Sequence, residues 1–337
     1  MIRLTLAACT LVLATLHGYG QQLPAEKMKH AMDSIKAAYI DMAALKMPII
    51  RQAGVTFETF GSGSIRSRLN NNPLFKGKTQ TSRVSAWFNV PVAHIGKTLI
   101  SANFGARHQI IDLYDVESFD PTVPVENGDI KKTMLSTSVS ATRLDSLFGK
   151  MAAYSFTASV VADPDTWQYR LVFTGLLSLT VKQTRTTSLS IGALVLTDPT
   201  APIPVIPYIR YSHRFKGSEL FIDPSRIALR KELTPRHFLW ISNDIGGNMA
   251  MFKFKNDRVP TKSIYTTLEL KSGLTYEYRL TKKTILSLGG GIVSTLNSRI
   301  LEQNKSREPF IKNKQAVVPY AQISISCLPF WKGLTHK

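Results

Sequence analysis

Ser212 and His213, in the stretch "YSHRF", are the side chains whose types best fit nucleophilic catalysis. A serine and a histidine on one β-strand can cooperate when they stand two residues apart, because alternate residues share a face. Ser212 and His213 are adjacent, and none of the seven histidines is followed by a serine two residues later. We therefore expect no catalytic residue and no enzymatic activity.

The sequence also predicts no metal site and no cofactor. His30 and Asp33 have the i, i+3 spacing of two ligands on one helix face, but a solvated helix face has the same pattern. The glycine triplet 289–291 has neither a following helix nor the Lys-Ser/Thr pair of a phosphate-binding loop. Small residues at a bend or in a tight interior explain the triplet.

The elements that would position any site are β-strands. Residues 266–280, "TTLELKSGLTYEYRL", alternate strictly between an apolar and a polar side, which indicates a strand with two different faces. The apolar side carries four leucines and two tyrosines, with Ser272 among them. Comparable segments recur between turn signals at 54–66, 81–92, 100–107, 135–142, 152–160, 170–182, 188–196, 205–214, 226–233, 238–254, 284–293 and 317–330.

Three features favour lipid over a protein core as the contact of the apolar faces. Several segments are longer than the five to six residues typical of soluble strands, and reach the roughly 9 to 11 that a membrane strand needs. The polar sides are rich in Ser, Thr, Gly and Asn, which suits a narrow interior. Aromatic residues lie toward segment ends, as interfacial girdles do: Tyr208, Tyr211, Phe238, Trp240, Tyr276, Tyr278, Phe330 and Trp331.

The predicted fold class is all-β, an antiparallel transmembrane β-barrel. Backbone groups in lipid must be paired within the protein, so the sheet has to close on itself. Thirteen segments are counted along the chain. Even strand numbers are the rule for bacterial single-chain barrels, which favours about 12 strands, within a range of about 10 to 14.

The N-terminus has the composition of a signal peptide, residues 1–20. A short basic start and an apolar stretch, 4–16, precede small residues at Gly18 and Gly20, which predicts cleavage near Gly20. An uncleaved anchor and a lipid-modified Cys9 are the alternatives. Export leaves Cys327 as the remaining cysteine, so no intramolecular disulfide is expected.

A short amphipathic helix is predicted between the signal peptide and the strands. Apolar residues follow helical spacing within 25–47, and Pro48 ends the run. The expected organisation is therefore a signal peptide, a helical segment at 21–50, a barrel at 51–331 and a C-terminal tail at 332–337. This helix packs on the barrel or its mouth in the simplest interpretation, and a membrane-surface helix is the alternative.

The formal net charge of +19 raises the question of a nucleic-acid partner. Export and the lack of a compact basic motif argue against one. The basic residues gather in turns such as "KGK" at 76–78 and "KNK" at 312–314, which solvated loops or contact with anionic lipid headgroups explain. The expected partners are outer-membrane lipid and small anionic solutes, and nothing in the sequence marks an oligomer interface, so a monomer is expected.

Charged residues on the polar faces would line the lumen of such a barrel. Basic rings favour anions in pores, whereas paired charges and water would fill a plugged barrel. Glu269 with Lys271, and Glu277 with Arg279, stand two apart on one face, within reach of each other. The candidate lumen residues are Arg83, Arg107, Arg170, Lys182, Arg210, Lys271, Arg279, Glu269 and Glu277.

One region of the sequence has a family resemblance. The stretch "PIPVIPYIRYSHRF" at 202–215, followed by "ELFIDPSRIALRKELTP" at 219–235 and "ISNDIGGN", resembles a family of uncharacterised bacterial outer-membrane β-barrel proteins, a domain of unknown function. The resemblance covers roughly residues 130–330. It implies a barrel in the outer membrane and implies no activity or catalytic residue.

These observations predict an outer-membrane β-barrel with a structural role or a role in the passage of small solutes. Paired charges in a plugged barrel are the favoured explanation of the lumen residues, and a preference for anions is kept as a hypothesis. Two alternatives stay open. An outer-membrane hydrolase acting on lipids would use Ser212 and His213, and a secreted soluble β-sandwich would bind a surface or a glycan.

Overall fold

The structure, a computed structural model, describes residues 40–198, 204–303 and 308–330. The predicted signal peptide, most of the predicted helix and the C-terminal tail lie outside these residues. Residues 40–46 are helical, and a single 3-10 turn follows at Pro48–Ile50. No helix among the described residues is long and apolar enough to cross a membrane.

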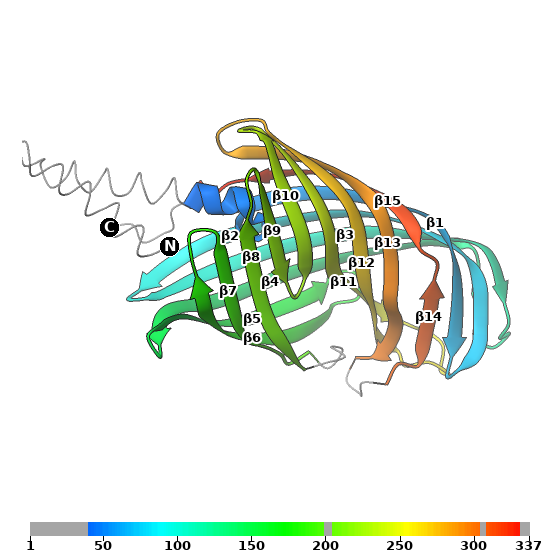
Figure 1. The fold of residues 1–337 in the computed structure, drawn as a ribbon. Helices are drawn as coiled ribbons and strands as arrows, with labels where there is room; N and C mark the ends of the chain where they lie inside the picture. Colours follow the sequence, from blue (N-terminus) through cyan, green and yellow to red (C-terminus); the bar gives the residue numbers. More distant parts are fainter. Residues whose placement is uncertain (1–39, 199–203, 304–307, 331–337) are drawn as a thin grey trace, which may run out of the picture.

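Fifteen antiparallel strands make up the rest of the fold (Figure 1). The first eight are β1 (Ala53–Leu69), β2 (Asn72–Ile95), β3 (Thr98–Ser118), β4 (Gly128–Leu147), β5 (Lys150–Asp163), β6 (Gln168–Gln183), β7 (Thr187–Leu196) and β8 (Val205–Arg214). The others are β9 (Ser218–Asp223), β10 (Arg226–Thr234), β11 (His237–Lys253), β12 (Lys262–Arg279), β13 (Thr284–Glu302), β14 (Ile311–Gln315) and β15 (Val318–Cys327).

Each strand from β1 to β13 pairs with its neighbour in sequence, and the last strands close the ring. β15 pairs with the first half of β1, over Ala53–Phe60, and β14 pairs with its second half, over Ile65–Leu69. Both also pair with β13 on their other side. β14 and β15 therefore share one position in the ring, which has fourteen positions in all.

The predicted strand number of about 12 is too low. β9 and β14 are the strands that the periodicity did not reveal. β9 has six residues and no clear alternation, and β14, "IKNKQ", is mostly polar. The count of thirteen segments was reduced to twelve to reach an even number, and this step was also wrong. β14 and β15 share one position, so the ring has an even number of positions, fourteen.

The two ends of the barrel differ in their connections. We call the end where β1 begins and β15 ends the near end, and the opposite end the far end. Near-end turns are two to four residues long, whereas four far-end connections have eight or nine. Short turns on the periplasmic side and long loops outside are typical of outer-membrane barrels. The long connections are 119–127, 197–204, 254–261 and 303–310.

Two of the far-end loops are joined by a hydrogen bond. The Asn256 amide Nδ2 donates to the Thr122 carbonyl at 2.7 Å, which joins loop 254–261 to loop 119–127. Within the second loop, the Thr122 hydroxyl and backbone N–H both donate to the Asp120 carboxylate. These bonds stabilise the charged form and hold the pKa of Asp120 below its ordinary value.

The outer surface of the ring is apolar and the interior face is polar, which reverses the arrangement of a soluble protein. Seven outward residues, each 45–55% exposed, define what we call the apolar belt: Phe104, Val139, Leu177, Ile241, Leu274, Ile292 and Ile325. Charged residues on the interior face are instead buried, with Arg83, Glu269 and Glu277 at most 7% exposed. In 266–280, the apolar side therefore faces outward.

Two of the predicted girdle aromatics face inward instead. Phe238 and Trp240 are 2% and 1% exposed. The guanidinium of Arg230 lies over both rings, with its central carbon 4.1 Å from the Phe238 centroid and 5.6 Å from that of Trp240. The assignment of these two residues to an interfacial girdle was wrong because they belong to the polar side of β11.

Opposite walls of the ring meet toward the far end. β4 and β11 are seven positions apart, yet they are in contact. Met251 and Ile264 lie on the outward side of their strands but are fully buried against Met134 and Val161 of the opposite interior face. The part of β11 and β12 that turns into the ring, residues 246–268, is called the inner hairpin below.

The glycine triplet 289–291 lies on β13 beside β12. A Cβ atom placed on Gly291 would collide with the backbone carbonyl oxygen of Ser272, and one on Gly273 would collide with that of Gly290. The close approach of two strands, rather than phosphate binding, explains the glycines.

Candidate functional site

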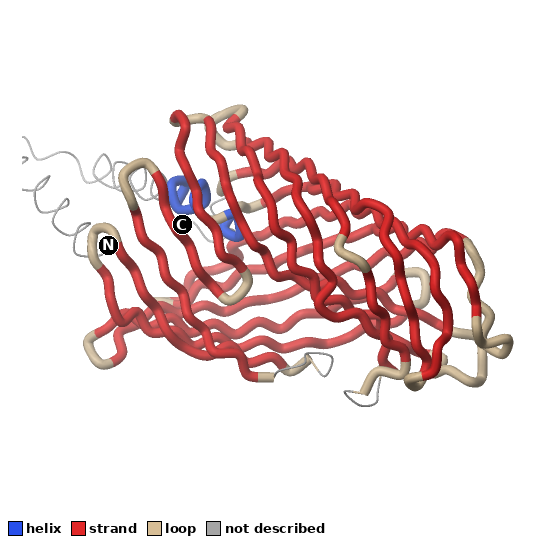
Figure 2. The backbone as a smooth tube through the Cα atoms, turned by 45° about the vertical axis from the view of Figure 1, so that its right-hand side comes forward, coloured by secondary structure: helices blue, strands red, loops and turns tan. Residues whose placement is uncertain are grey.

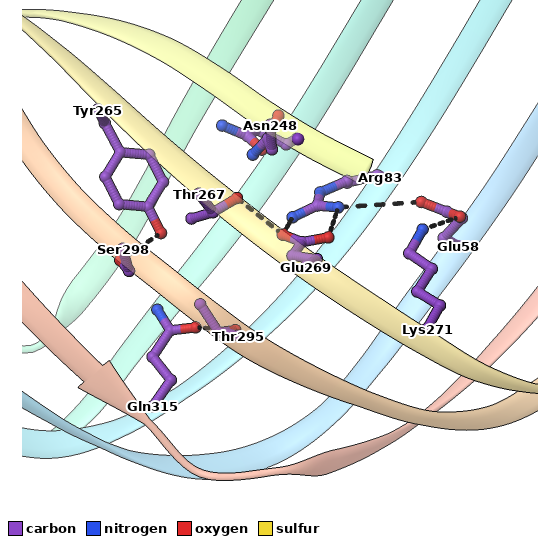
Figure 3. Close-up of polar contacts among 12 residues, drawn as sticks. Glu58, Arg83, Asn248, Tyr265, Thr267, Glu269, Lys271, Thr295, Ser298 and Gln315 are labelled. Carbon is purple, nitrogen blue, oxygen red and sulfur yellow. Dashed lines mark hydrogen bonds and ion pairs between the residues drawn. The ribbon is translucent and has the colours of Figure 1, made fainter. Parts of the chain in front are cut away.

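A network of charged side chains crosses the interior of the barrel (Figure 3). Arg83 of β2 donates from both terminal nitrogens to the two Glu269 oxygens of β12, at 2.8 and 2.5 Å. Thr267 adds a hydrogen bond to the same carboxylate at 2.9 Å. Glu58 of β1 lies 4.0 Å from Arg83 and accepts from Lys271 at 2.5 Å. The network joins three strands from two sides of the ring.

This network corrects the predicted pairing along single strands. Glu269 pairs with Arg83 across the interior rather than with Lys271 two residues away. Glu277 pairs with Arg51 at 2.8 Å, and Arg279 donates to the Lys282 carbonyl in the adjoining turn. Because the ring is curved, side chains of different strands can approach each other in the interior more closely than side chains that stand two residues apart on one strand.

The segment 40–52 lies in the near mouth of the barrel, where its helix is seen beside the ring of strands (Figure 2). Ala44 is fully buried against Ile285 and Leu328 at the ends of β13 and β15. Arg51 is 3% exposed and bonds both Glu277 and Ser326 on the interior face. We call this segment the plug.

Ion pairs fix the plug to opposite sides of the mouth. Asp41 binds Lys283 in the β12–β13 turn at 2.6 Å, and Lys46 binds Glu219 of β9 at 2.9 Å. Arg210 of β8 contacts the Met47 sulfur at 2.8 Å. The helix predicted between the signal peptide and the barrel therefore packs in the mouth, as far as its described part extends.

The other predicted lumen residues fall into two groups. Arg170 is 8% exposed and pairs with Asp198 at 2.7 Å. Arg107 faces the interior and donates to Ser85 at 3.2 Å and to Asn248 at 3.1 Å. Lys182 is exposed at the near end of β6, beside a break in register, and does not join the interior network.

Sequence reasoning missed several interior charges. Glu58 and Arg230 stand on strands whose alternation was visible, so extending the face assignment to every segment would have found them. Arg51 precedes the first strand, and no periodicity marks it. Lys132 and Asp163, which pair at 3.3 Å beneath the inner hairpin, lie in parts of β4 and β5 just outside the predicted segments.

Most carboxylates of the interior are held in ion pairs, whereas three of its arginines are not. The ion pairs of the described residues include each of seven carboxylates that face the interior or its mouths: Glu58, Asp163, Asp198, Glu219, Asp244, Glu269 and Glu277. Arg107, Arg210 and Arg230 take part in none of them. Their partners are neutral oxygens, a sulfur atom and aromatic rings. These three guanidinium groups therefore form no ion pair of their own, although Glu232 stands two residues from Arg230 on the same face of β10.

The pair weighed as a catalytic candidate is not assembled. His213 Nδ1 and the Thr187 hydroxyl are 2.8 Å apart, and the imidazole stacks beside Tyr211 and Phe215. Ser212 is paired in register with Phe221 on the neighbouring strand. Among the described residues, no group of histidine, cysteine and carboxylate side chains could hold a metal ion.

A closed antiparallel ring with an apolar outer belt and a charged, hydrogen-bonded interior is a β-barrel of the membrane-spanning class. No protein-family model matches the chain, and no curated protein does. The resemblance to uncharacterised outer-membrane barrels therefore has no support from a family model.

Several solved structures are distantly similar to the chain. An outer membrane channel from Pseudomonas putida F1 is 11% identical, covers 82% of this chain and 96% of its own, and has a TM-score of 0.33. The P. putida toluene transporter TodX is 10% identical over 82% of this chain and 89% of its own, at 0.35. The translocator domain of the Neisseria meningitidis autotransporter NalP is 9% identical over 88% and 98%, at 0.30. Similarity at this level carries no argument about the function of the chain.

Proposed function

We propose that this protein is a monomeric outer-membrane β-barrel that passes small solutes and prefers anions. The observation that carries the proposal is the apolar belt around an interior in which seven carboxylates are paired, while Arg107, Arg210 and Arg230 form no ion pair. An apolar belt requires lipid as its partner, which argues against a secreted soluble β-protein. The three guanidinium groups supply the positive potential that draws anions into a pore.

Two elements stand in the path through the ring. The plug lies in the near mouth, and the inner hairpin packs against the interior face of β4 and β5. In the proposed function, conduction requires at least one of them to move. The plug is the simpler gate, because two of its ion pairs involve the mouth and not the buried network of Arg83 and Glu269.

Anion preference is tested by reversal potentials in planar bilayers under a salt gradient. We expect the wild-type open pore to favour chloride over potassium. Arg210→Gln with Arg230→Gln removes two guanidinium charges that form no ion pair and should shift the reversal potential toward that of a cation-selective pore. Lys76→Gln changes a solvated charge at the far tip of β2 and serves as the control. A wild-type pore that prefers potassium would contradict the proposal.

Loosening the plug should raise the probability that the pore is open. Asp41→Ala with Lys46→Ala removes both ion pairs of the helix but retains the Arg51–Glu277 pair. We expect longer and more frequent open events in single-channel recordings, with unchanged barrel stability. The matched control is Lys97→Ala, which removes an exposed ion pair with Asp145 at the same end. Equal effects of the two variants would show that the plug is not the gate.

A further inference from the structure

An internal cavity of about 550 Å³ lies between the β2–β5 wall and the inner hairpin. Its volume falls in the range of roughly 300 to 1,000 Å³ that is typical of small-molecule sites. The lining is largely apolar and includes Trp87, Met134, Val161 and Met249. Such a cavity is suited to an apolar chain.

The cavity also contains Arg107, which forms no ion pair with a carboxylate. Its guanidinium donates only to neutral acceptors, including the Gly247 carbonyl at 3.4 Å and the Asn248 amide oxygen at 3.1 Å. The carboxylate of Asp198, which also lines the cavity, is bound to Arg170 at 2.7 Å. A buried or half-buried guanidinium beside apolar surface favours a bound anion.

A seam in the wall leads from the lipid side toward this cavity. β6 pairs with β7 from Thr174 onward, and β11 pairs with β10 only as far as Asp244. The edges 168–172 and 246–253 therefore lack a neighbouring strand on one side within the described sheet. Two side-chain bonds span the gap, from the Gln168 amide to the Phe252 carbonyl at 3.2 Å and from the Gln303 amide to the Tyr169 carbonyl at 3.0 Å.

We infer that the cavity binds a single-chain anionic amphiphile, with its apolar chain against Trp87, Met134 and Val161 and its anionic head at Arg107. The seam gives such a molecule a path that does not cross the aqueous mouths. This inference rests on the proposed function, because it assumes that the barrel lies in a membrane. It adds the chemical class of one solute that the barrel would bind.

The test uses quenching of Trp87 fluorescence by a brominated amphiphile. Trp167, Trp240 and Trp331 are replaced by phenylalanine, so that Trp87 is the single tryptophan, and the full mature chain is placed in nanodiscs of zwitterionic lipid. ω-Bromoundecanoate should quench Trp87 in a saturable manner. Arg107→Gln should weaken this binding about tenfold or more, because a hydrogen bond to a charged group is worth about 1.5 to 3 kcal/mol.

Three comparisons make the result specific. Arg230→Gln removes a second interior arginine that forms no ion pair and does not line the cavity, and it should leave the affinity for the probe unchanged. Arg107→Lys retains the charge and should bind more tightly than Arg107→Gln. ω-Bromoundecanol has no charge and should bind equally to the parent protein and to Arg107→Gln.

Quenching that rises linearly with the concentration of the probe, without saturation, would overturn the inference. So would quenching that is the same in the Arg107→Gln protein as in the parent protein. Either result leaves the proposed function intact, because conduction is measured separately. A chain that does not insert into nanodiscs would overturn the inference and the proposed membrane location together. Heat-dependent gel mobility checks that each variant is folded.

Discussion

Replacing Glu269 by glutamine should lower the free energy of unfolding by about 3 to 5 kcal/mol, the cost of leaving a buried charge without its partner. Arg83 is 7% exposed and donates two hydrogen bonds to this carboxylate. Its next carboxylate, Glu58, lies 4.0 Å away and already binds Lys271. Urea unfolding in detergent, followed by gel mobility without boiling, measures the change.

The double variant Arg83→Gln with Glu269→Gln is the control for this prediction. It removes both charges, so no unpaired guanidinium remains, and most of the lost stability should return. Lys76→Gln, which breaks an exposed pair with Glu117, should have no measurable effect. A single Glu269→Gln variant as stable as the parent would show that the interior is solvated enough to compensate the charge.

Leu274→Arg should destabilise the folded barrel by about 2 to 4 kcal/mol, because it places a charge in the hydrocarbon region. Leu274 is 52% exposed in the middle of β12, between Ile241 and Gly290 on the neighbouring strands. Unfolding is measured in lipid vesicles, where the outward face meets a bilayer.

The matched control is Leu233→Arg. Leu233 has a similar exposure, 49%, but stands at the near end of β10, where arginine reaches the headgroups and costs about 0 to 1 kcal/mol. Equal costs at the two positions would mean that the apolar belt does not lie in hydrocarbon.

The sequence was most informative where one physical requirement acts along a whole strand. In 266–280, every second residue must meet the same environment, so alternation alone assigned the two faces correctly. That lipid covers the apolar face stays a prediction from strand length. β9 and β14 were not predicted because they are short. Six residues at a tight turn, and five residues of which four are polar, carry too little periodicity.

The interior site was predictable only in part. The faces of Arg83 and Glu269 follow from alternation, but their pairing depends on the curvature of the ring, which no single strand records. The burial of Met251 and Ile264 is a second example. Both stand on the outward side, and they are covered because the inner hairpin folds against the opposite wall. Contacts between distant strands lie beyond local sequence patterns.

The uneven height of the wall has a consequence for the surrounding lipid. β2 has 24 residues, whereas β9 has six and is followed at once by the turn at Pro224 and Ser225. At about 3.3 Å per residue, β9 is about 20 Å long before tilt, shorter than the roughly 25 Å apolar band of such barrels. Hydrophobic mismatch on this side has to be relieved by thinning of the bilayer. If the barrel lies in a bilayer, the lipids beside β9 are compressed and those beside β2 are not, so the protein imposes an asymmetric deformation on its own membrane.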